Sequence, residues 1–290
     1  MLHKSTWLHL RIPFSFYLMP VFLFALSISP SANTGYTLLV FVILHLFLYP
    51  ASNGYNSYFD KDESSIGGLE NPPPVRKELY YTSLFFDLIA LIMGVFISLE
   101  FALMLLIYGL ISKAYSHPSI RLKKYPFGGW LMAGLFQGFF TFIMIYIGIN
   151  QLTLSASLQE AVLFPAFLSS VLLWGSYPMT QIYQHEEDSR RGDYTLSIRL
   201  GIKGTFMFTA GVFVLANIGF ILFFLQYFSP REAILFQVFI LPMLLYFFYW
   251  FGRVRKDARA ANFKSTMQLN TISAVCLNIF FLVIYITHAI

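Results

Sequence analysis

Residues 204–227 read GTFMFTAGVFVLANIGFILFFLQY, and residues 232–251 read EAILFQVFILPMLLYFFYWF. Glu232 is the only charged residue in either stretch, and each is close to the ~20 residues that a helix needs to cross about 30 Å of hydrocarbon. The whole chain of 290 residues is 57% hydrophobic and 11% charged, whereas a soluble domain carries about 25% charge. A membrane β-barrel would alternate apolar and polar residues with a period of two. We therefore predict an all-α, polytopic membrane bundle.

Nine apolar blocks recur along the chain, and we treat residues 1–290 as one domain. We place a boundary at Ser98–Glu100, because 82–114 is too long for a single crossing. We expect the first block to be a membrane helix rather than a cleaved signal, since it lacks a small-x-small site and further spans follow it. The blocks are 13–29, 35–52, 82–98, 100–114, 130–149, 161–182, 204–227, 232–251 and 268–288.

The placement of the basic residues tests this count of spans. With nine crossings, the N-terminus and the loops after the second, fourth, sixth and eighth spans lie on one side of the membrane. Every Lys and Arg of the 19 in the chain falls on that side except Arg231. Cytoplasmic loops collect Lys and Arg, so we predict a cytoplasmic N-terminus and an outside C-terminus. The net charge of +5 then indicates topology rather than nucleic-acid binding.

The first cytoplasmic loop, residues 51–74, reads ASNGYNSYFDKDESSIGGLENPPP. If the second span continues as a helix, Asn53, Asn56 and Asp60 share one face. Oxygen ligands at a helix end suit Mg²⁺, which prefers one or two carboxylates together with water and substrate phosphate. A solvated acidic helix end would explain this loop equally well.

A second polar cluster lies in the third cytoplasmic loop, residues 181–201, QIYQHEEDSRRGDYTLSIRLG. Gln184 and Asp188 are spaced i, i+4, and Arg190, Arg191 and Arg199 follow them. Carboxylates beside arginines favour a metal-bridged polyphosphate, although an ion-paired surface loop has the same composition. Because both loops are expected on the same side, we predict that they share a site.

The spacing of these residues resembles that of the UbiA superfamily of intramembrane prenyltransferases. That family combines nine helices with an Asn-x-x-x-Asp-x-x-x-Asp motif after the second, and with an Asp-x-x-x-Asp motif after the sixth that continues to Gly, Thr-Leu and Leu-Gly. The segment KAYSHPSIRLKKYPFGG, residues 113–129, is also similar to a Tyr-Ser segment of the family that is followed by basic residues. The matching residues of the two motifs are Asn56, Asp60, Asp188, Gly192, Thr195, Leu196, Leu200 and Gly201.

The resemblance implies Mg²⁺-assisted transfer of an isoprenyl group from its diphosphate to an acceptor, which the sequence does not identify beyond a possible aromatic or quinone precursor. Under this interpretation Asn56, Asp60 and Asp188 are catalytic, and Mg²⁺ is bound by these three residues together with Gln184. The substrate-binding candidates are Asn53, Tyr115, Lys123, Lys124 and Arg191.

Two positions depart from the family pattern, since Ser64 and Gln184 stand where the family has Asp. A local shift would let Asp62 or Glu63 replace the first carboxylate and Glu187 the second. With fewer charges, an active site would hold Mg²⁺ more weakly, and Ser64→Asp with Gln184→Asp would lower the Mg²⁺ requirement. The missing carboxylates also leave open a non-catalytic protein of this fold that binds an isoprenoid or quinone. A secondary transporter is less favoured, because no inverted repeat is visible.

Overall fold

The computed structural model describes residues 2–288, and within that range it contains helices and no strands. Eight helical segments are long and apolar enough to cross a membrane, and a bent pair near the N-terminus makes a ninth. The eight are α3–α4 (Thr34–Asp60), α5 (Glu78–Val95), α6 (Leu99–Ser116), α7–α8 (Pro126–Asn150), α9 (Glu160–Gln181), α11 (Leu196–Tyr227), α12 (Pro230–Lys256) and α13 (Phe263–His288). The predicted all-α membrane bundle is confirmed.

The first predicted span is broken, contrary to the single helix expected over 13–29. Helix α1 (Lys4–Leu10) ends at Arg11, whose φ of 48° is left-handed, and a 3₁₀ segment (Ile12–Tyr17) leads into α2 (Met19–Ser27). Proline lies in the first turn of both segments, at Pro13 and Pro20. Because proline lacks an N–H and disfavours helix at the preceding residue, it begins helices and interrupts them. The segment Lys4–Tyr17 and helix α2 meet at a bend of 40°.

The predicted boundary between the third and fourth spans is present at Ser98. The Ser98 hydroxyl accepts a hydrogen bond of 3.0 Å from the N–H of Phe101, which makes Ser98 the N-cap of α6. A serine in this position satisfies a backbone donor that the first turn of a helix leaves free. Two short helices therefore replace one overlong element.

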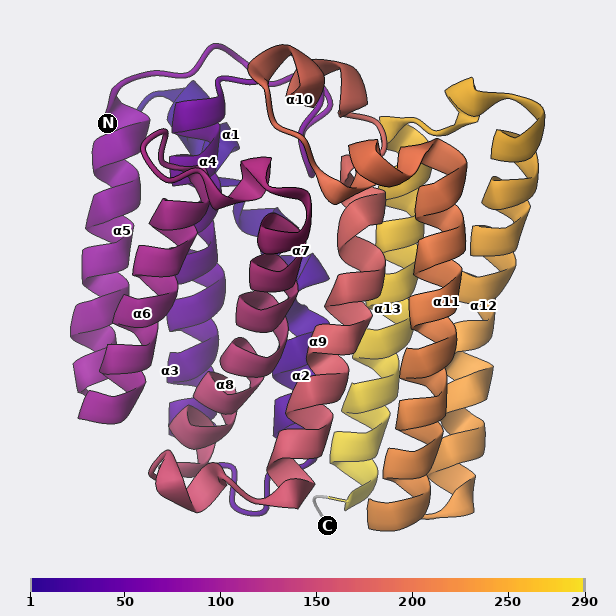
Figure 1. Cartoon of the computed structure of the whole chain (residues 1–290). Helices are drawn as coiled ribbons and strands as arrows, with labels where there is room; N and C mark the ends of the chain where they lie inside the picture. The colour runs from indigo at the N-terminus through magenta and orange to yellow at the C-terminus, as the bar shows by residue number, and fades with distance from the viewer. Residues whose placement is uncertain (1, 289–290) are drawn as a thin grey trace.

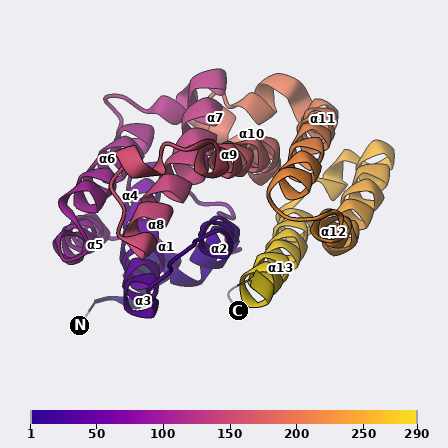
Figure 2. The same cartoon turned by 90° about the horizontal axis from the view of Figure 1, so that it is seen from below.

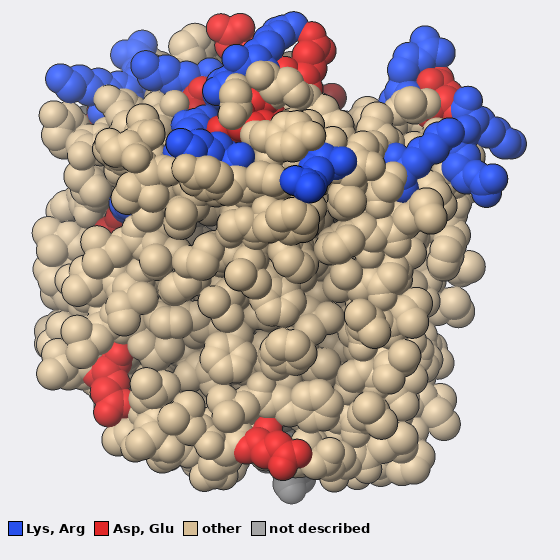
Figure 3. All heavy atoms as spheres, viewed as in Figure 1, with Lys and Arg blue, Asp and Glu red and all other residues tan. Residues whose placement is uncertain are grey.

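The helices run alongside one another between two ends of the bundle (Figure 1). Seen along the bundle, α5 and α6 lie at one edge and α11 and α12 at the other, with α2, α8 and α9 between them (Figure 2). Helix α1 begins at one end and α13 finishes at the other, as an odd number of crossings requires (Figure 1). Lys and Arg gather at the end where α1 begins, above a broad uncharged band (Figure 3).

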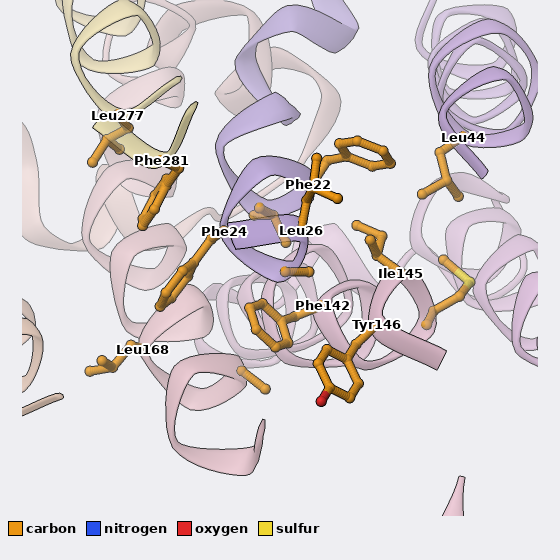
Figure 4. Close-up of a cluster of buried hydrophobic side chains, with 14 of the residues drawn as sticks. Phe22, Phe24, Leu26, Leu44, Phe142, Ile145, Tyr146, Leu168, Leu277 and Phe281 are labelled. Carbon is orange, nitrogen blue, oxygen red and sulfur yellow. The ribbon is translucent and has the colours of Figure 1, made fainter. Parts of the chain in front are cut away.

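Aromatic side chains join the first span to the rest of the bundle. Phe24 of α2 stacks on Phe281 of α13 with ring centroids 4.4 Å apart, and it meets Phe142 of α8 edge-on at 5.3 Å (Figure 4). All three rings are nearly inaccessible to solvent. Since lipid tails are as apolar as these side chains, close packing rather than water exclusion holds such helices together. The contact fixes α2 beside the helices that build the site.

Candidate functional site

A cavity of about 370 Å³ opens among the helices near the charged end of the bundle. Its walls combine two kinds of side chain. Most of the polar and ionised groups come from the ends of α4, α6 and α9 and from the loops that follow them, whereas α2, α11 and α13 contribute mainly apolar groups. The apolar lining includes Val21, Phe24, Phe136, Phe213, Leu277 and Phe281. One compartment therefore offers both a polar and an apolar surface to a ligand.

The end of α4 (Tyr49–Asp60) supplies the first polar group of residues. The helix continues beyond the predicted 35–52 span, so Asn53, Asn56 and Asp60 all line the cavity. Lys61 then takes a left-handed conformation, with φ 50° and ψ 43°, which ends the helix and reverses the chain. As a result Asp62 also lines the cavity and is buried.

A similar reversal follows α10 (His185–Arg191). Asp188 and Arg191 line the cavity, and Gly192 closes the helix with a φ of 76°. Glycine adopts this conformation at no steric cost. Asp193 comes directly afterwards, is 2% exposed and also lines the cavity. Each acidic loop thus brings two carboxylates to the cavity, one on the helix and one beyond its left-handed end.

The loop between α6 and α7 adds the basic residues. Arg121, also left-handed with φ 48°, precedes a 3₁₀ turn (Leu122–Lys124) in which Lys123 is buried. Lys123 forms an ion pair with Asp60, which Arg121 contacts at 3.3 Å. Arg121 also donates to both carboxylate oxygens of Asp193, at 2.6 and 2.7 Å.

Arg191 joins the two acidic loops. Its guanidinium pairs with Asp62, contacts Asp188 at 3.1 Å and donates to the carbonyl of Asp60 at 3.1 Å. In this ion-pair network four carboxylates face three cations, so the formal charge is −1. Paired buried charges of this kind satisfy one another, and Arg11, which lines the same cavity, supplies a fourth positive charge.

Burial and the neighbouring charges shift the pKa of these carboxylates. Burial raises the pKa of Asp188 to about 6, against the opposing charges of Lys123 and Arg191. Burial and the charge of Asp60 also raise the pKa of Asp62. Burial would raise the pKa of Asp193 too, but the hydrogen bonds from Arg121 and the charge of Lys123 bring it below the ordinary value. A divalent cation would therefore stabilise the ionised forms of Asp62 and Asp188 most, because their burial disfavours the charge.

The donor set fits Mg²⁺ in its chemistry. Carboxylate oxygens of Asp60 and Asp188 and amide oxygens of Asn56 and Gln184 all line the cavity. The Asn56 amide nitrogen donates to Ser116 at 2.9 Å, which leaves the Asn56 oxygen free to bind a cation. Within residues 2–288 no three acidic, His or Cys side chains converge as a ready metal cage. Mg²⁺ uses one or two carboxylates and completes its shell with water and phosphate, so this set suits a substrate-borne ion.

Eight of the nine residues predicted for the site line the cavity: Asn53, Asn56, Asp60, Tyr115, Lys123, Gln184, Asp188 and Arg191. Lys124 does not. Its ammonium lies over the ring of Tyr125, 5.0 Å from the centroid. Lys123 and Lys124 are neighbours in a tight turn and take different directions, so only Lys123 reaches the cavity.

The structure distinguishes the three residues considered as replacements for the missing carboxylates. Asp62 lines the cavity, whereas Glu63 and Glu187 do not. Glu187 accepts hydrogen bonds from the N–H groups of Glu63 at 2.8 Å and Ser64 at 3.2 Å, and from the Ser64 hydroxyl. Ser64 is exposed and serves to join the loop after α4 to α10.

Three charged residues near the cavity were not among the predicted site residues. Asp193 and Arg121 lie in the very segments that carried the family resemblance, but their spacing matched no motif. Arg11 lines the cavity and donates to the carbonyls of Gly67 at 3.1 Å and Asn53 at 3.3 Å. Its position at the break of the first span, invisible in hydropathy, accounts for the omission. His185 lies outside the lining and contacts Ser197 at 2.7 Å.

Comparison with known proteins places this geometry in context. A search of curated proteins found no match. Among solved structures, a UbiA homologue from Aeropyrum pernix K1 in its apo form has a TM-score of 0.71 at 16% identity, covering 94% of this chain and 98% of that one. A UbiA homologue from Archaeoglobus fulgidus bound to GPP and Mg²⁺ has a TM-score of 0.66 at 16% identity, with 97% and 99% covered. A digeranylgeranylglyceryl phosphate synthase has 0.61 at 19% identity, with 98% and 97% covered.

At these identities the solved structures establish a shared fold and no more. The family assignment comes from the sequence itself, because the model of the UbiA prenyltransferase family matches residues 17–272. That range extends from the broken first span into α13 and includes both acidic loops. The chain belongs to the UbiA prenyltransferase family.

Proposed function

We propose that this protein transfers an isoprenyl group from an isoprenyl diphosphate to an acceptor, with Mg²⁺ assisting departure of the diphosphate. One observation carries the proposal: the carboxylates of both acidic loops meet at the polar part of a cavity whose remaining walls are apolar. An isoprenyl diphosphate has the same two parts, an anionic head and a hydrocarbon tail. The Archaeoglobus homologue was solved with GPP and Mg²⁺, which supports this class of donor.

The polar part of the cavity would bind the head of the donor. Asp60 and Asp188, with the amide oxygens of Asn56 and Gln184, would hold Mg²⁺, and Asp62 adds a further carboxylate. Bound Mg²⁺ neutralises charge that builds up on a leaving diphosphate. Lys123 and Arg191 would exchange their carboxylate partners for phosphate oxygens, since carboxylates and phosphates both accept charge-assisted hydrogen bonds. Asn53 and Tyr115 line the same region.

The apolar part would hold the hydrocarbon tail and keep water out. The bond between the allylic carbon and the diphosphate oxygen breaks with its electron pair on oxygen. The allylic cation is then attacked by the acceptor, which loses a proton. The rings of Phe24, Phe136, Phe213 and Phe281 line the cavity, and aromatic faces attract a cation when water is excluded. Exclusion of water also prevents hydrolysis of the cation.

A non-catalytic isoprenoid-binding protein is the second candidate. The observation in its favour is that every carboxylate of the network already has a basic partner. Both candidates predict binding of an isoprenoid by the purified chain, but only the first predicts release of diphosphate.

The deciding experiment measures release of inorganic diphosphate from geranyl diphosphate, with and without Mg²⁺, alongside direct binding of the same compound. Mg²⁺-dependent release that rises when membrane lipid extract supplies an acceptor supports the transferase. Tight binding with no release in the presence of such an extract supports the binding protein. Absence of binding contradicts the transferase.

A further inference from the structure

The connection between α12 (Pro230–Lys256) and α13 (Phe263–His288) carries a concentration of positive charge that lies outside the cavity. Asp257 is its only acidic residue, and none of its cations lines the cavity. In Figure 3 it stands out as a separate blue projection at the upper right, around one small red group. We call this group the basic hairpin, and its cations are Arg253, Arg255, Lys256, Arg259 and Lys264.

Most of this charge is not neutralised by the protein. Among the residues that the structure describes, Arg259 pairs with Asp257 at 3.0 Å, while the other four cations form no ion pair. All five are exposed. Lys123, Arg121 and Arg191 at the cavity, by contrast, are bound by carboxylates. The basic hairpin is therefore free to attract an external anion.

The backbone beneath these cations is held in place. The Trp250 indole N–H donates to the carbonyl of Ala260 at 2.7 Å, and Val254 is buried on the same helix. The Asp257 carboxylate accepts from the N–H of Arg259, and Asn262 accepts from the N–H of Ser265, both at 3.0 Å. Little backbone ordering is then required on binding, which favours affinity. A shallow open groove lies here, lined by Arg253, Lys256, Asp257, Arg259, Ala260 and Asn262.

The position of the basic hairpin along the axis of the bundle indicates which kind of anion it would meet. Phe248 and Tyr249 are 61% and 60% exposed on the apolar flank of α12, where a span faces lipid. The Arg253 guanidinium lies over the Tyr249 ring, 5.9 Å from its centroid, and one helical turn is about 5.4 Å. Exposed tyrosine and tryptophan rings are enriched at the boundary between hydrocarbon and headgroups, and Tyr249 is a ring of this kind. The cations directly beyond that ring therefore lie at headgroup level.

We propose that the basic hairpin binds the phosphodiester headgroup of an anionic phospholipid. A phosphodiester accepts bidentate hydrogen bonds from guanidinium groups, and each Lys or Arg near a membrane surface strengthens attraction to anionic lipid by about fivefold. A soluble acidic partner would have no need of the aromatic boundary beneath the charge. This binding is independent of the chemistry proposed for the cavity.

The test compares lipid binding by four forms of the full-length protein, the wild type and three variants. Each is purified in detergent with equal amounts of phosphatidylglycerol and phosphatidylcholine, and the retained lipids are counted by native mass spectrometry. The first variant, R255Q/K256Q/K264Q, removes three charges from the basic hairpin. The matched control, K61Q/R76Q/K77Q, removes three exposed and unpaired charges from the loop between α4 and α5. A charge-preserving variant, R255K/K264R, keeps the positive charge while changing the side chains. It tests whether a loss of lipid binding comes from altered folding instead of from lost charge.

We expect the wild type, the matched control and the charge-preserving variant to retain phosphatidylglycerol preferentially. The preference for phosphatidylglycerol over phosphatidylcholine should fall at least about tenfold in the basic-hairpin variant. This is less than the maximum loss expected if each of the three removed cations contributed a factor of about five. An equal loss in the matched control would show a general surface effect and overturn the proposal. Retention of the preference in the basic-hairpin variant would also overturn it, as would displacement of the lipid by soluble glycerol phosphate, which would identify a free-phosphate site.

Discussion

Asp60 is held by two basic side chains, Lys123 and Arg121, and faces the cavity beside Asp188. Both basic residues come from the loop between α6 and α7. Arg191 of α10 donates to the backbone carbonyl of Asp60 and to the carboxylate of Asp188. In such a network a charge removed at one residue leaves its former partner buried and unpaired. Substitutions here consequently act on charge balance as well as on metal binding.

Asp60→Asn and Asp188→Asn should each lower Mg²⁺-dependent diphosphate release by at least about 100-fold, the effect typical of losing a group that stabilises developing charge. Steady-state release with geranyl diphosphate measures this directly. Glu63→Gln is the matched control, because Glu63 is an exposed acid that does not line the cavity. Unchanged turnover in both Asn variants would show that these two carboxylates are structural.

Ser64→Asp should not restore a carboxylate to the cavity, although the family pattern alone suggested that it would. Ser64 is exposed and donates to Glu187, so the new carboxylate would oppose an existing one. We expect thermal unfolding in detergent to occur at a lower temperature, with a loss of roughly 1 kcal/mol, and no decrease in the Mg²⁺ requirement.

Adding Glu187→Gln to Ser64→Asp should recover stability, because the repulsion is then removed; a double-mutant cycle isolates that pairwise effect.

Asp62→Asn, by contrast with Ser64→Asp, should raise the Mg²⁺ concentration needed for release of diphosphate. A lowered Mg²⁺ requirement in Ser64→Asp would mean that the loop can move its new carboxylate into the cavity.

At the scale of single elements, two spans contain a π-helical turn within their length, at Ile43–Leu48 and Leu135–Phe140. In the second, Ser170 of α9 accepts from the N–H of Phe139 at 2.8 Å and donates to the carbonyl of Gly134 at 2.9 Å. A π turn leaves backbone groups without their usual partners, and one serine on a neighbouring helix supplies them. The side chains of Phe136 and Gln137, within the turn, line the cavity.

Gly138→Ala should disturb this helix contact. A Cβ at Gly138 would lie 2.5 Å from the backbone Cα and N of Ser170, which cannot move independently of α9. Overpacking of this kind costs about 1–3 kcal/mol, so the unfolding temperature should fall. Gly211→Ala is the control, since its Cβ meets nothing within 4 Å in the middle of α11 and alanine favours helix by up to about 1 kcal/mol. Equal behaviour of the two variants would contradict the close approach of the two helices.

For the whole molecule, Lys and Arg gather at one end of the bundle (Figure 3), and the bent N-terminal pair, counted as one span, gives nine crossings. We predict that the N-terminus is cytoplasmic and the C-terminus lies outside, because cytoplasmic segments retain Lys and Arg. A phosphatase and a fluorescent reporter fused in turn to each end should give opposite signals. The same signal at both ends would refute nine crossings.

The sequence alone was sufficient for the all-α class, the split at Ser98, the residues of the two acidic loops and a number of spans consistent with the eight or nine that the structure allows. These follow from properties that act locally: the length of helix that crosses hydrocarbon, the preference of serine for a helix N-terminus, and the i, i+4 spacing along a helical face. The expected topology, with both loops on one side of the membrane, added the prediction that they share a site, and eight of the nine predicted residues do line one cavity.

Only the tertiary structure decided which carboxylates face that cavity. Spacing along a helix carries no information once the helix ends, and it ends at Lys61 and Gly192 in left-handed conformations. Those two reversals direct Asp62 and Asp193 inward, while the contact with Glu187 keeps Ser64 outside. The break at Arg11 was likewise not predicted from the sequence, because hydropathy measures how apolar a segment is and not where its backbone turns.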